Sequence, residues 1–88
     1  MKIVWSQNAW TDYLDWQIHD PVIIGRINEL IRSAMRTPFV GLGKPEPLKG
    51  DLSGWWSRRI TSDHRLVYRI RGSKDDQAIE IAQCRFHY

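Results

Sequence analysis

Apolar and polar residues alternate most regularly in residues 55–71, with the two-residue period of a half-buried β-strand. Turn-forming residues such as Ser62 and Asp63 interrupt the alternation at its middle. The stretch therefore predicts a β-hairpin with one face on the core and the other towards solvent. The core face is expected to carry Trp56, Ile60, Leu66, Tyr68 and Ile70, and the opposite face Arg59, Arg65, Arg69 and Arg71.

The beginning of the chain has the longer period of amphipathic helices. Apolar residues recur at helical spacing in residues 7–19 and 20–35, after a short apolar run at 2–5 that predicts a strand. Ser6 and Asp20 are the expected N-caps. So few residues join the two helices that we expect an antiparallel pair. The stripe of the first helix that is expected to enter the core is Trp10, Tyr13, Leu14 and Ile18.

Residues 37–54 follow neither period and contain three of the four prolines and four of the six glycines. They predict an irregular connector that its prolines stiffen, because each proline fixes its own φ and restricts the preceding residue. A turn at 72–76 then leads to a last strand at 77–85. The apolar register of that strand slips near Ala82, which predicts a bulge or burial on both faces.

The predicted element order is β-α-α-β-β-β, within a single domain that spans residues 1–88. It indicates an α+β fold in which a mostly antiparallel sheet has two helices on one face and its other face open. Hydrophobic residues make up 42% of the chain, and five tryptophans supply large buried surfaces. The single cysteine, Cys84, excludes an intrachain disulfide and favours a reducing, cytoplasmic setting. We find neither an apolar run of the ~20 residues that span a membrane nor a signal-peptide h-region.

The charge is modest overall but unevenly distributed. Thirteen basic and ten acidic residues give a net charge of +3, and nine of the basic residues lie from Lys44 onward. The second half of the chain is therefore the expected anion-binding half. A row of guanidinium groups on a rigid sheet suits phosphate, because each group is permanently charged and forked. For any single arginine of this row, a solvated outer face is the simpler interpretation.

Candidate acid and base groups flank the arginine face in the sequence. Glu46 lies between two prolines in the connector, and the chain ends in His87 and Tyr88. Extended strand register would bring the side chain of His87 to the side of Arg59 and Arg65. Cleavage of RNA by its own 2′-hydroxyl requires such a set: a base, cations on the phosphorane and an acid for the departing 5′ oxygen. Each residue alone also fits a simpler interpretation, as a loop acid or frayed terminus, and His64 is assigned to the turn.

The whole chain closely resembles the Txe/YoeB family of bacterial toxins, within the RelE/ParE superfamily. The motifs that carry the resemblance are Trp5-Ser6, Asp12-Tyr13-Leu14, Trp16-Gln17, Ile27-Asn28-Glu29-Leu30-Ile31, Arg36-Thr37-Pro38-Phe39, Gly43-Lys44-Pro45-Glu46-Pro47-Leu48-Lys49, Leu52-Ser53-Gly54, Trp56-Ser57-Arg58-Arg59-Ile60-Thr61, His64-Arg65-Leu66-Val67-Tyr68 and Cys84-Arg85-Phe86-His87-Tyr88. Among the differences, Phe86 stands where the family commonly has tyrosine. The resemblance implies a RelE-like fold and a ribosome-dependent endoribonuclease that cuts mRNA during translation.

The resemblance also implies roles for individual residues. Glu46 would be the general base, His87 the general acid, Arg65 the cation on the transition state and Tyr88 a positioning group. The expected RNA-binding residues are Lys44, Lys49 and Arg59. No cofactor and no metal are implied.

The partners implied are a YefM/Phd-type antitoxin, the ribosome with its mRNA and a second copy of the chain. Operator DNA would be contacted only through the antitoxin, and no membrane is involved. Two alternatives stay open. A ParE-like gyrase poison would share the fold without needing acid and base residues. A noncatalytic nucleic-acid-binding module would use the arginines alone, although no helix-turn-helix pattern supports it.

Overall fold

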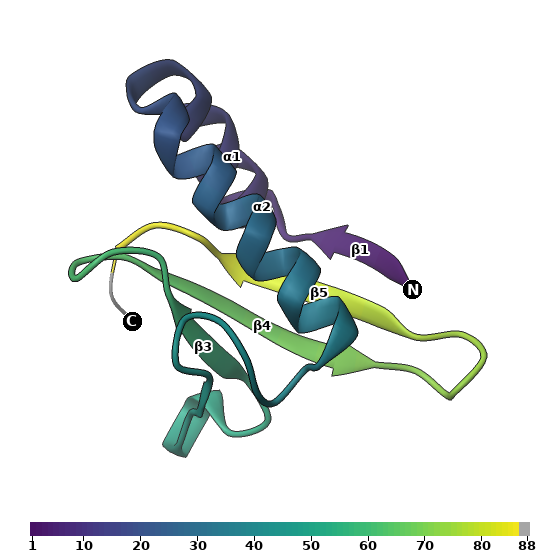
Figure 1. The fold of residues 1–88 in the computed structure, drawn as a ribbon. Coiled ribbons are helices and arrows are strands. Elements are labelled where there is room, and N and C mark those ends of the chain that lie inside the picture. The colour runs from purple at the N-terminus through teal and green to yellow at the C-terminus, as the bar shows by residue number, and fades with distance from the viewer. Residues whose placement is uncertain (87–88) are drawn as a thin grey trace.

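The computed structural model describes residues 1–86, which form one five-stranded sheet and two α-helices (Figure 1). In chain order the elements are β1 (Lys2–Trp5), α1 (Gln7–His19), α2 (Pro21–Arg36), β2 (Glu46–Pro47), the short 3-10 helix η1 (Gly50–Leu52), β3 (Trp56–Arg59), β4 (Arg65–Arg71) and β5 (Ala78–Gln83). No helix of the described residues has the length and apolar character needed to cross a membrane.

The strands lie side by side in the order β1-β5-β4-β3-β2. β1 runs parallel to β5, and the other neighbouring pairs are antiparallel. The predicted α+β fold is thus confirmed. The strand β2 was not predicted, because a two-residue strand inside the proline-rich connector is too short to show alternation.

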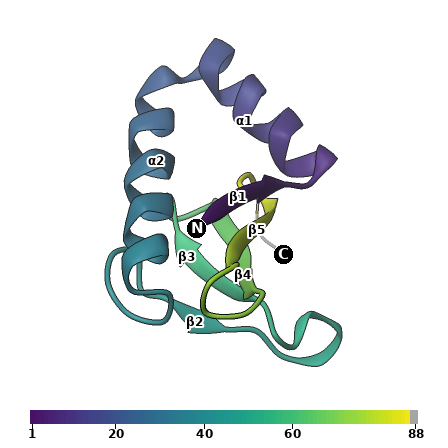
Figure 2. The same cartoon turned by 90° about the vertical axis from the view of Figure 1, so that its right-hand side faces the viewer.

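The second helix and the sheet form the main core. α2 runs along one face of the sheet, and α1 diverges from it towards the end where β1 and β5 meet (Figure 2). One cluster joins Ala9 of α1 to the buried side of α2 and the apolar face of the strands. Its other members are Ile27, Leu30, Ile31, Ala34, Ile60, Leu66, Tyr68, Ile79, Ile81 and Cys84. The alternation predicted for the hairpin is therefore confirmed on its core side.

The helix ends follow the predicted caps in one case and depart from them in the other. Ser6 accepts a hydrogen bond from the Ala9 N–H through its Oγ at 3.0 Å. Asp20 stands at the N-cap of α2, but its side chain makes no capping bond. The reason is that Asp20 also ends α1, where its own N–H donates to the Trp16 carbonyl, and its backbone has φ −156° and ψ 81°.

Of the four residues in the stripe predicted for the first helix, only Tyr13 packs against the core, and the prediction is wrong for the other three. Trp10 is 46% and Ile18 76% exposed, and Leu14 of the same stripe is 40% exposed. The helix turns Ala9 and Asp12 inwards, with the half-buried Tyr13 and Trp16 beside them. Both sets have helical spacing, so periodicity alone could not tell which side meets the sheet.

The register slip in the last strand is a β-bulge. Val67 pairs with Gln83 and Tyr68 pairs with Ile81, which leaves Ala82 as an extra residue in β5. Ile79 and Ile81 point into the core before the bulge, and the extra residue turns Cys84, which follows it, into the core as well. The first of the two predicted explanations is therefore confirmed.

Candidate active site

The face of the sheet turned away from α2 brings three predicted site residues together. Glu46 on β2 lies opposite Ser57 on β3, and Ser57 lies opposite Val67 on β4. Arg59 and Arg65 oppose each other two residues further along the same strands. Directly opposed residues of antiparallel strands, and residues two apart in one strand, project to the same side. Glu46, Arg59 and Arg65 therefore share one face.

The centre of this face is buried and its margins are charged. Ser57 and Val67 are 3% and 2% exposed, whereas Glu46 and Arg59 are exposed and Arg65 is half-buried. The face predicted to be open is thus exposed at its margins and buried at its middle, where Ser57 and Val67 lie. A polyanion that reaches this face meets guanidinium groups and a carboxylate around a buried floor formed by Ser57 and Val67.

A buried arginine holds the connector that carries Glu46. Arg58 is fully buried, on the core side of β3. Its Nε donates to the Tyr68 hydroxyl at 2.9 Å, and one terminal nitrogen donates to Ser33 Oγ at 2.8 Å. The terminal nitrogens also donate to the carbonyls of Thr37, Pro38, Val40 and Leu42. Arg58 is one of the nine basic residues in the half of the chain that is expected to bind anions. For Arg58 this expectation is wrong, because its buried side chain cross-links α2, β4 and the connector.

Tyr68 completes the same network. Its hydroxyl donates to the Pro38 carbonyl at 2.6 Å while it accepts from Arg58. Burial raises the pKa of Tyr68, and the neighbouring Arg58 acts in the opposite direction. The phenol is thus a neutral part of the core that fixes the start of the connector.

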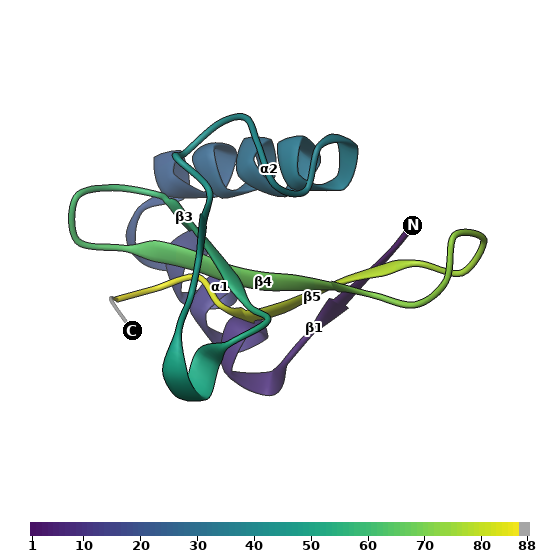
Figure 3. The ribbon, with the colours of Figure 1, turned by 90° about the horizontal axis from the view of Figure 1, so that it is seen from below.

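Gly43 lets the connector approach β3 closely. The Arg59 N–H donates to the Gly43 carbonyl at 2.7 Å. A Cβ at this glycine, which has φ +81°, would stand 2.7 Å from Leu30 Cδ2 and 3.2 Å from the Arg59 carbonyl oxygen. The next residue, Lys44, also has positive φ, at 52°. The connector then passes the edge of the sheet to reach η1 on the side opposite α2 (Figure 3), which brings Glu46 to the candidate face.

The Arg65 guanidinium closes the hairpin loop from within. One terminal nitrogen donates to the carbonyls of Thr61, Ser62 and His64 at 2.8, 3.1 and 3.0 Å. These bonds immobilise the side chain at the edge of the candidate face. A guanidinium carries five N–H donors in a planar fork, so the group has donors for phosphate as well.

The predicted row of arginines is not uniform. Arg69 donates through Nε to Glu80 at 2.6 Å, and its guanidinium lies over the Trp55 ring at 4.3 Å from the centroid. Its charge is therefore largely compensated within the sheet. Arg71 is exposed at the end of β4. The cationic part of the candidate face is consequently smaller than predicted and centres on Arg59 and Arg65.

The predicted RNA-binding lysines lie along the connector. Lys44 is exposed directly after the contact of Gly43 with Arg59. Lys49 is exposed where η1 begins. Both lysines lie on the connector, one on each side of Glu46 in the sequence. Lys44 is held beside Arg59 of the candidate face, because the preceding Gly43 accepts the Arg59 N–H.

The predicted His87 and Tyr88 lie outside the described residues, which end at Phe86. The backbone of Phe86 is bonded to the hairpin loop at both of its polar groups. Its N–H donates to His64 Nδ1 at 2.7 Å, and its carbonyl accepts from the Arg65 N–H at 3.0 Å. From the sequence, His64 was assigned to the turn and given no functional role. The only sequence signal for such a role is its position directly before Arg65.

Helix α1 anchors the segment that leads to Phe86. Asp12 accepts a hydrogen bond from the Cys84 N–H at 3.1 Å, and the Trp16 indole N–H donates to the Cys84 carbonyl at 2.8 Å. Burial raises the pKa of Asp12, although the Cys84 N–H and the nearby Arg85 act in the opposite direction. Arg85 donates to Asp15 at 3.3 Å.

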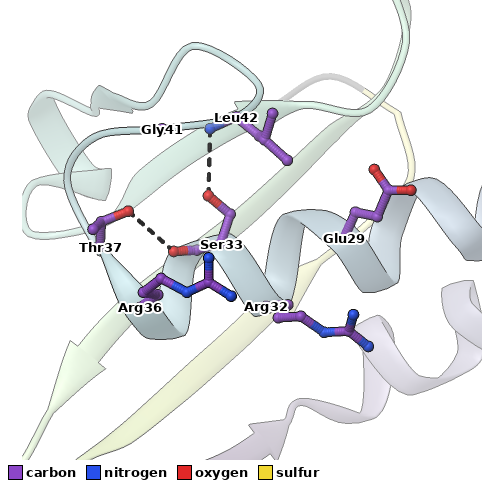
Figure 4. Close-up of a pocket in the computed structure, with 7 residues that line it drawn as sticks. All are labelled: Glu29, Arg32, Ser33, Arg36, Thr37, Gly41 and Leu42. Carbon is purple, nitrogen blue, oxygen red and sulfur yellow. Dashed lines mark hydrogen bonds between the residues drawn. The ribbon is translucent and has the colours of Figure 1, made fainter.

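A separate cavity of about 350 Å³ lies between α2 and the connector (Figure 4). Ser33 spans its wall, where the hydroxyl accepts from the Leu42 N–H at 3.3 Å. The lining residues are Glu29, Arg32, Ser33, Arg36, Thr37, Gly41 and Leu42. None of the predicted site residues is among them, so the cavity is no part of the candidate site. Within residues 1–86, no three His, Cys, Asp or Glu side chains are grouped as a metal site would require.

Comparison with known proteins identifies the family. The family model described as "YoeB-like toxin of bacterial type II toxin-antitoxin system" matches residues 5–88. The chain belongs to this family. Toxin YoeB of Escherichia coli strain K12 is 57% identical over 88 residues, which cover 100% of both chains.

Solved structures of YoeB toxins have the same fold. A YoeB/ParE toxin from Agrobacterium tumefaciens is 60% identical, covers 100% of both chains and superposes with a TM-score of 0.98. YoeB from Staphylococcus aureus has been solved as a dimer and in a heterotetrameric YoeB–YefM complex, at 43% and 42% identity. Both of these structures give a TM-score of 0.87 and cover 100% of this chain and 98% of their own. The YoeB-like chain thus keeps the family architecture over its whole length.

Proposed function

We propose that this YoeB-like toxin is an endoribonuclease that cuts mRNA on translating ribosomes and so inhibits translation. The observation that carries the proposal is the strand register, which sets Glu46 on the same face as Arg59 and Arg65. A carboxylate beside two guanidinium groups, each placed by a rigid sheet, suits proton removal next to a phosphate. The family membership supports a toxin role for this site.

In the proposed reaction, Glu46 removes the proton of an RNA 2′-hydroxyl, and the 2′ oxygen attacks the adjacent phosphorus. Arg65 donates to the phosphorane oxygens and stabilises the added negative charge. The bond from phosphorus to the 5′ oxygen breaks, and His87 gives that oxygen a proton. Tyr88 orients the reacting phosphate. The products are a 2′,3′-cyclic phosphate and a 5′-hydroxyl.

RNA binding in this proposal depends on the exposed cations around the buried floor. Arg59 lies on the floor's margin, and Lys44 and Lys49 extend the positive surface along the connector. These residues contact phosphates and hold the strand in register, while the base preference comes from other contacts.

The proposed partner of the toxin is an acidic antitoxin of the YefM/Phd type. The S. aureus YoeB, which this chain resembles, was solved together with YefM. A disordered acidic segment that folds on binding suits a basic face, because attraction guides its approach. A second copy of the chain is a further proposed partner, in line with the S. aureus YoeB dimer. Operator DNA would be reached only through the antitoxin.

Single-turnover cleavage of mRNA on translating ribosomes tests the proposed function. Glu46→Gln and His87→Gln keep size and polarity but remove proton exchange, so each should slow cleavage by roughly 10²–10⁴-fold. Ribosome binding should change far less. The double variant should lose less than the product of the two factors, because both residues act in one step. Asp51→Asn, an exposed acid on the same connector, is the matched control and should cut at the wild-type rate.

Product analysis tests the chemistry independently of the rates. The upstream fragment should end in a 2′,3′-cyclic phosphate or its opened 3′-phosphate. A 5′-phosphate on the downstream fragment would refute the mechanism. Normal cleavage by both the Glu46→Gln and His87→Gln variants would also refute it.

A further inference from the structure

The backbone of Phe86 is held by two consecutive residues, His64 at the end of the β3–β4 loop and Arg65 at the start of β4. Its N–H donates to His64 Nδ1 at 2.7 Å, and its carbonyl accepts from the Arg65 N–H at 3.0 Å. The loop that ends at His64 is itself fixed, because the His64 carbonyl accepts from the Ile60 N–H at 3.0 Å. The segment just before His87 is therefore attached to a rigid support.

The bond from Phe86 determines the state of the His64 ring. A nitrogen that accepts an N–H bond carries a lone pair, so Nδ1 is unprotonated and the neutral ring has its proton on Nε2. The half-buried ring meets Trp16 edge-on at 4.9 Å between centroids. Trp16 in turn donates to the Cys84 carbonyl, so the aromatic neighbour that orients His64 is also fixed.

The conformation of Phe86 shows that these bonds act against a local preference. Its φ is +63°, in the left-handed region that side chains with a Cβ rarely adopt. The Phe86 side chain is 59% exposed, so burial of the ring does not hold it there. Such a backbone conformation persists only where the surroundings enforce it. The two backbone hydrogen bonds contribute to that enforcement. The Phe86 ring adds contacts with the His64 ring, at 5.7 Å between centroids, and with the Arg85 guanidinium, at 4.8 Å from the ring centroid.

We propose that His64 is a positioning residue for the C-terminal catalytic group. By accepting the Phe86 N–H, His64 fixes the backbone of the residue that directly precedes His87. This inference rests on the proposed function, in which His87 is the general acid. A displaced acid remains present but transfers its proton less often, and misplacement by about 1 Å can cost about 10²-fold in rate.

Two variants of equal shape isolate the hydrogen bond. Asparagine puts its side-chain carbonyl oxygen close to the place of Nδ1, whereas leucine has the same branching and no acceptor. Both His64→Asn and His64→Leu lose the edge-on contact with Trp16, so their difference reports the acceptor alone. Single-turnover cleavage on ribosomes should fall roughly 10–100-fold in His64→Leu, and His64→Asn should recover most of that loss. His64→Phe, which keeps an aromatic ring against Trp16, replaces the leucine variant if the latter does not fold.

Repeating His64→Asn and His64→Leu in a protein that also carries His87→Gln separates a loss of positioning from a loss of folded protein. In His87→Gln, the difference between His64→Asn and His64→Leu should vanish, because His64 acts through His87. A general loss of folded toxin would persist in that background. Ribosome binding should be alike in both variants.

Nitrogen NMR of the wild-type toxin tests the geometry without any cleavage assay. A coupling across the hydrogen bond should connect the Phe86 amide nitrogen with His64 Nδ1 and should disappear in His64→Leu. Absence of the coupling in the wild type would overturn the inference at its first step. A coupling with equal cleavage by His64→Asn and His64→Leu would overturn the positioning role. If His87→Gln itself cuts normally, the proposed function and the role of His64 both fail, while the coupling still decides the hydrogen bond.

Discussion

At the scale of single residues, burial rather than sequence position decides what each charged or reactive group does. Arg58 and Arg59 are neighbours, yet one is fully buried among carbonyl groups and the other is exposed on the candidate face. The alternation of the strand predicted that they point to opposite sides. It could not predict that the buried one would find six acceptors, because those belong to α2, β4 and a connector without periodicity.

Cys84 should be inert in the folded toxin. Burial raises the pKa of this thiol from 9.0 to about 12, and the nearby Asp12 acts in the same direction. The reactive thiolate is therefore roughly 10³-fold scarcer than for an ordinary cysteine. We expect iodoacetamide at pH 8 to leave the native protein unmodified over a time that labels the urea-unfolded chain completely, as mass spectrometry would show. Equal labelling rates would contradict this expectation.

Asp12 should make the stability of the toxin depend on pH. Burial raises the pKa of Asp12 in the folded state, so the native protein binds more protons than the unfolded chain above the ordinary value of 3.8. The contribution of this residue to stability is therefore complete below that value and is lost as the pH rises through the folded pKa. Asp12→Asn does not titrate and still offers an acceptor to the Cys84 N–H.

Urea unfolding across a pH series measures this effect. The free energy of unfolding of Asp12→Asn minus that of the wild type should increase from below pH 3.8 towards neutrality. A difference that shrinks over this range would show that the carboxylate form is the favoured one.

At the scale of elements, the strands with regular alternation could be predicted and the segments held by single contacts could not. The hairpin and its two faces follow from residues 55–71, because a half-buried strand imposes its period on the sequence. The two-residue β2 depends on Gly43 and on the Arg58 network, which leave no periodic signal. For the same reason, the sequence marks Glu46 as a candidate site residue but does not show that it pairs with Ser57 between two strands.

Loss of the Arg58 side chain should loosen the whole connector. Arg58→Met removes the donors of four backbone carbonyls and of the Tyr68 hydroxyl in a buried site. Hydrogen bonds from a charged group are worth about 1.5–3 kcal/mol each, so we expect a loss of at least about 3 kcal/mol in the free energy of unfolding. Arg58→Lys should restore only part of it, because an ammonium group has three donors.

Urea titrations of the variants provide the measurement. The exposed Arg71→Lys is the control, and it should change the free energy of unfolding by less than about 0.5 kcal/mol. A loss for Arg58→Met as small as that of the control would mean that water replaces the guanidinium at little cost.

At the scale of the whole molecule, α1 carries an exposed apolar stripe. The outer side of this helix exposes Trp10, Leu14 and Ile18. Periodicity assigned that stripe to the core because a helix with apolar residues on two sides gives no direction. The tertiary contact that decides the direction, between α1 and the end of β5, joins segments far apart in the chain.

Binding of an acidic antitoxin should depend on salt. If its segment covers the face with Arg59 and Arg65, added salt screens the attraction, since the Debye length falls from about 10 Å at 0.1 M to about 3 Å at 1 M. Affinity measured by calorimetry should fall steadily across a sodium chloride series. Arg59→Gln should reduce the slope, whereas Arg71→Gln, at the far end of β4, should leave it unchanged. A flat series would speak against an interface led by charge.

The parallel pairing of β1 with β5 has a consequence for how the toxin is made. These strands lie at opposite ends of the described chain, so the sheet stays incomplete until the last strand has left the ribosome that synthesises it. α1 also depends on late residues, because its contacts to Cys84 form only then. A chain that ends at Asp76 should therefore show no cooperative thermal transition by circular dichroism, and a sharp transition would refute this. The toxin would thus remain incompletely folded while its own message is being read, before the proposed nuclease site can form.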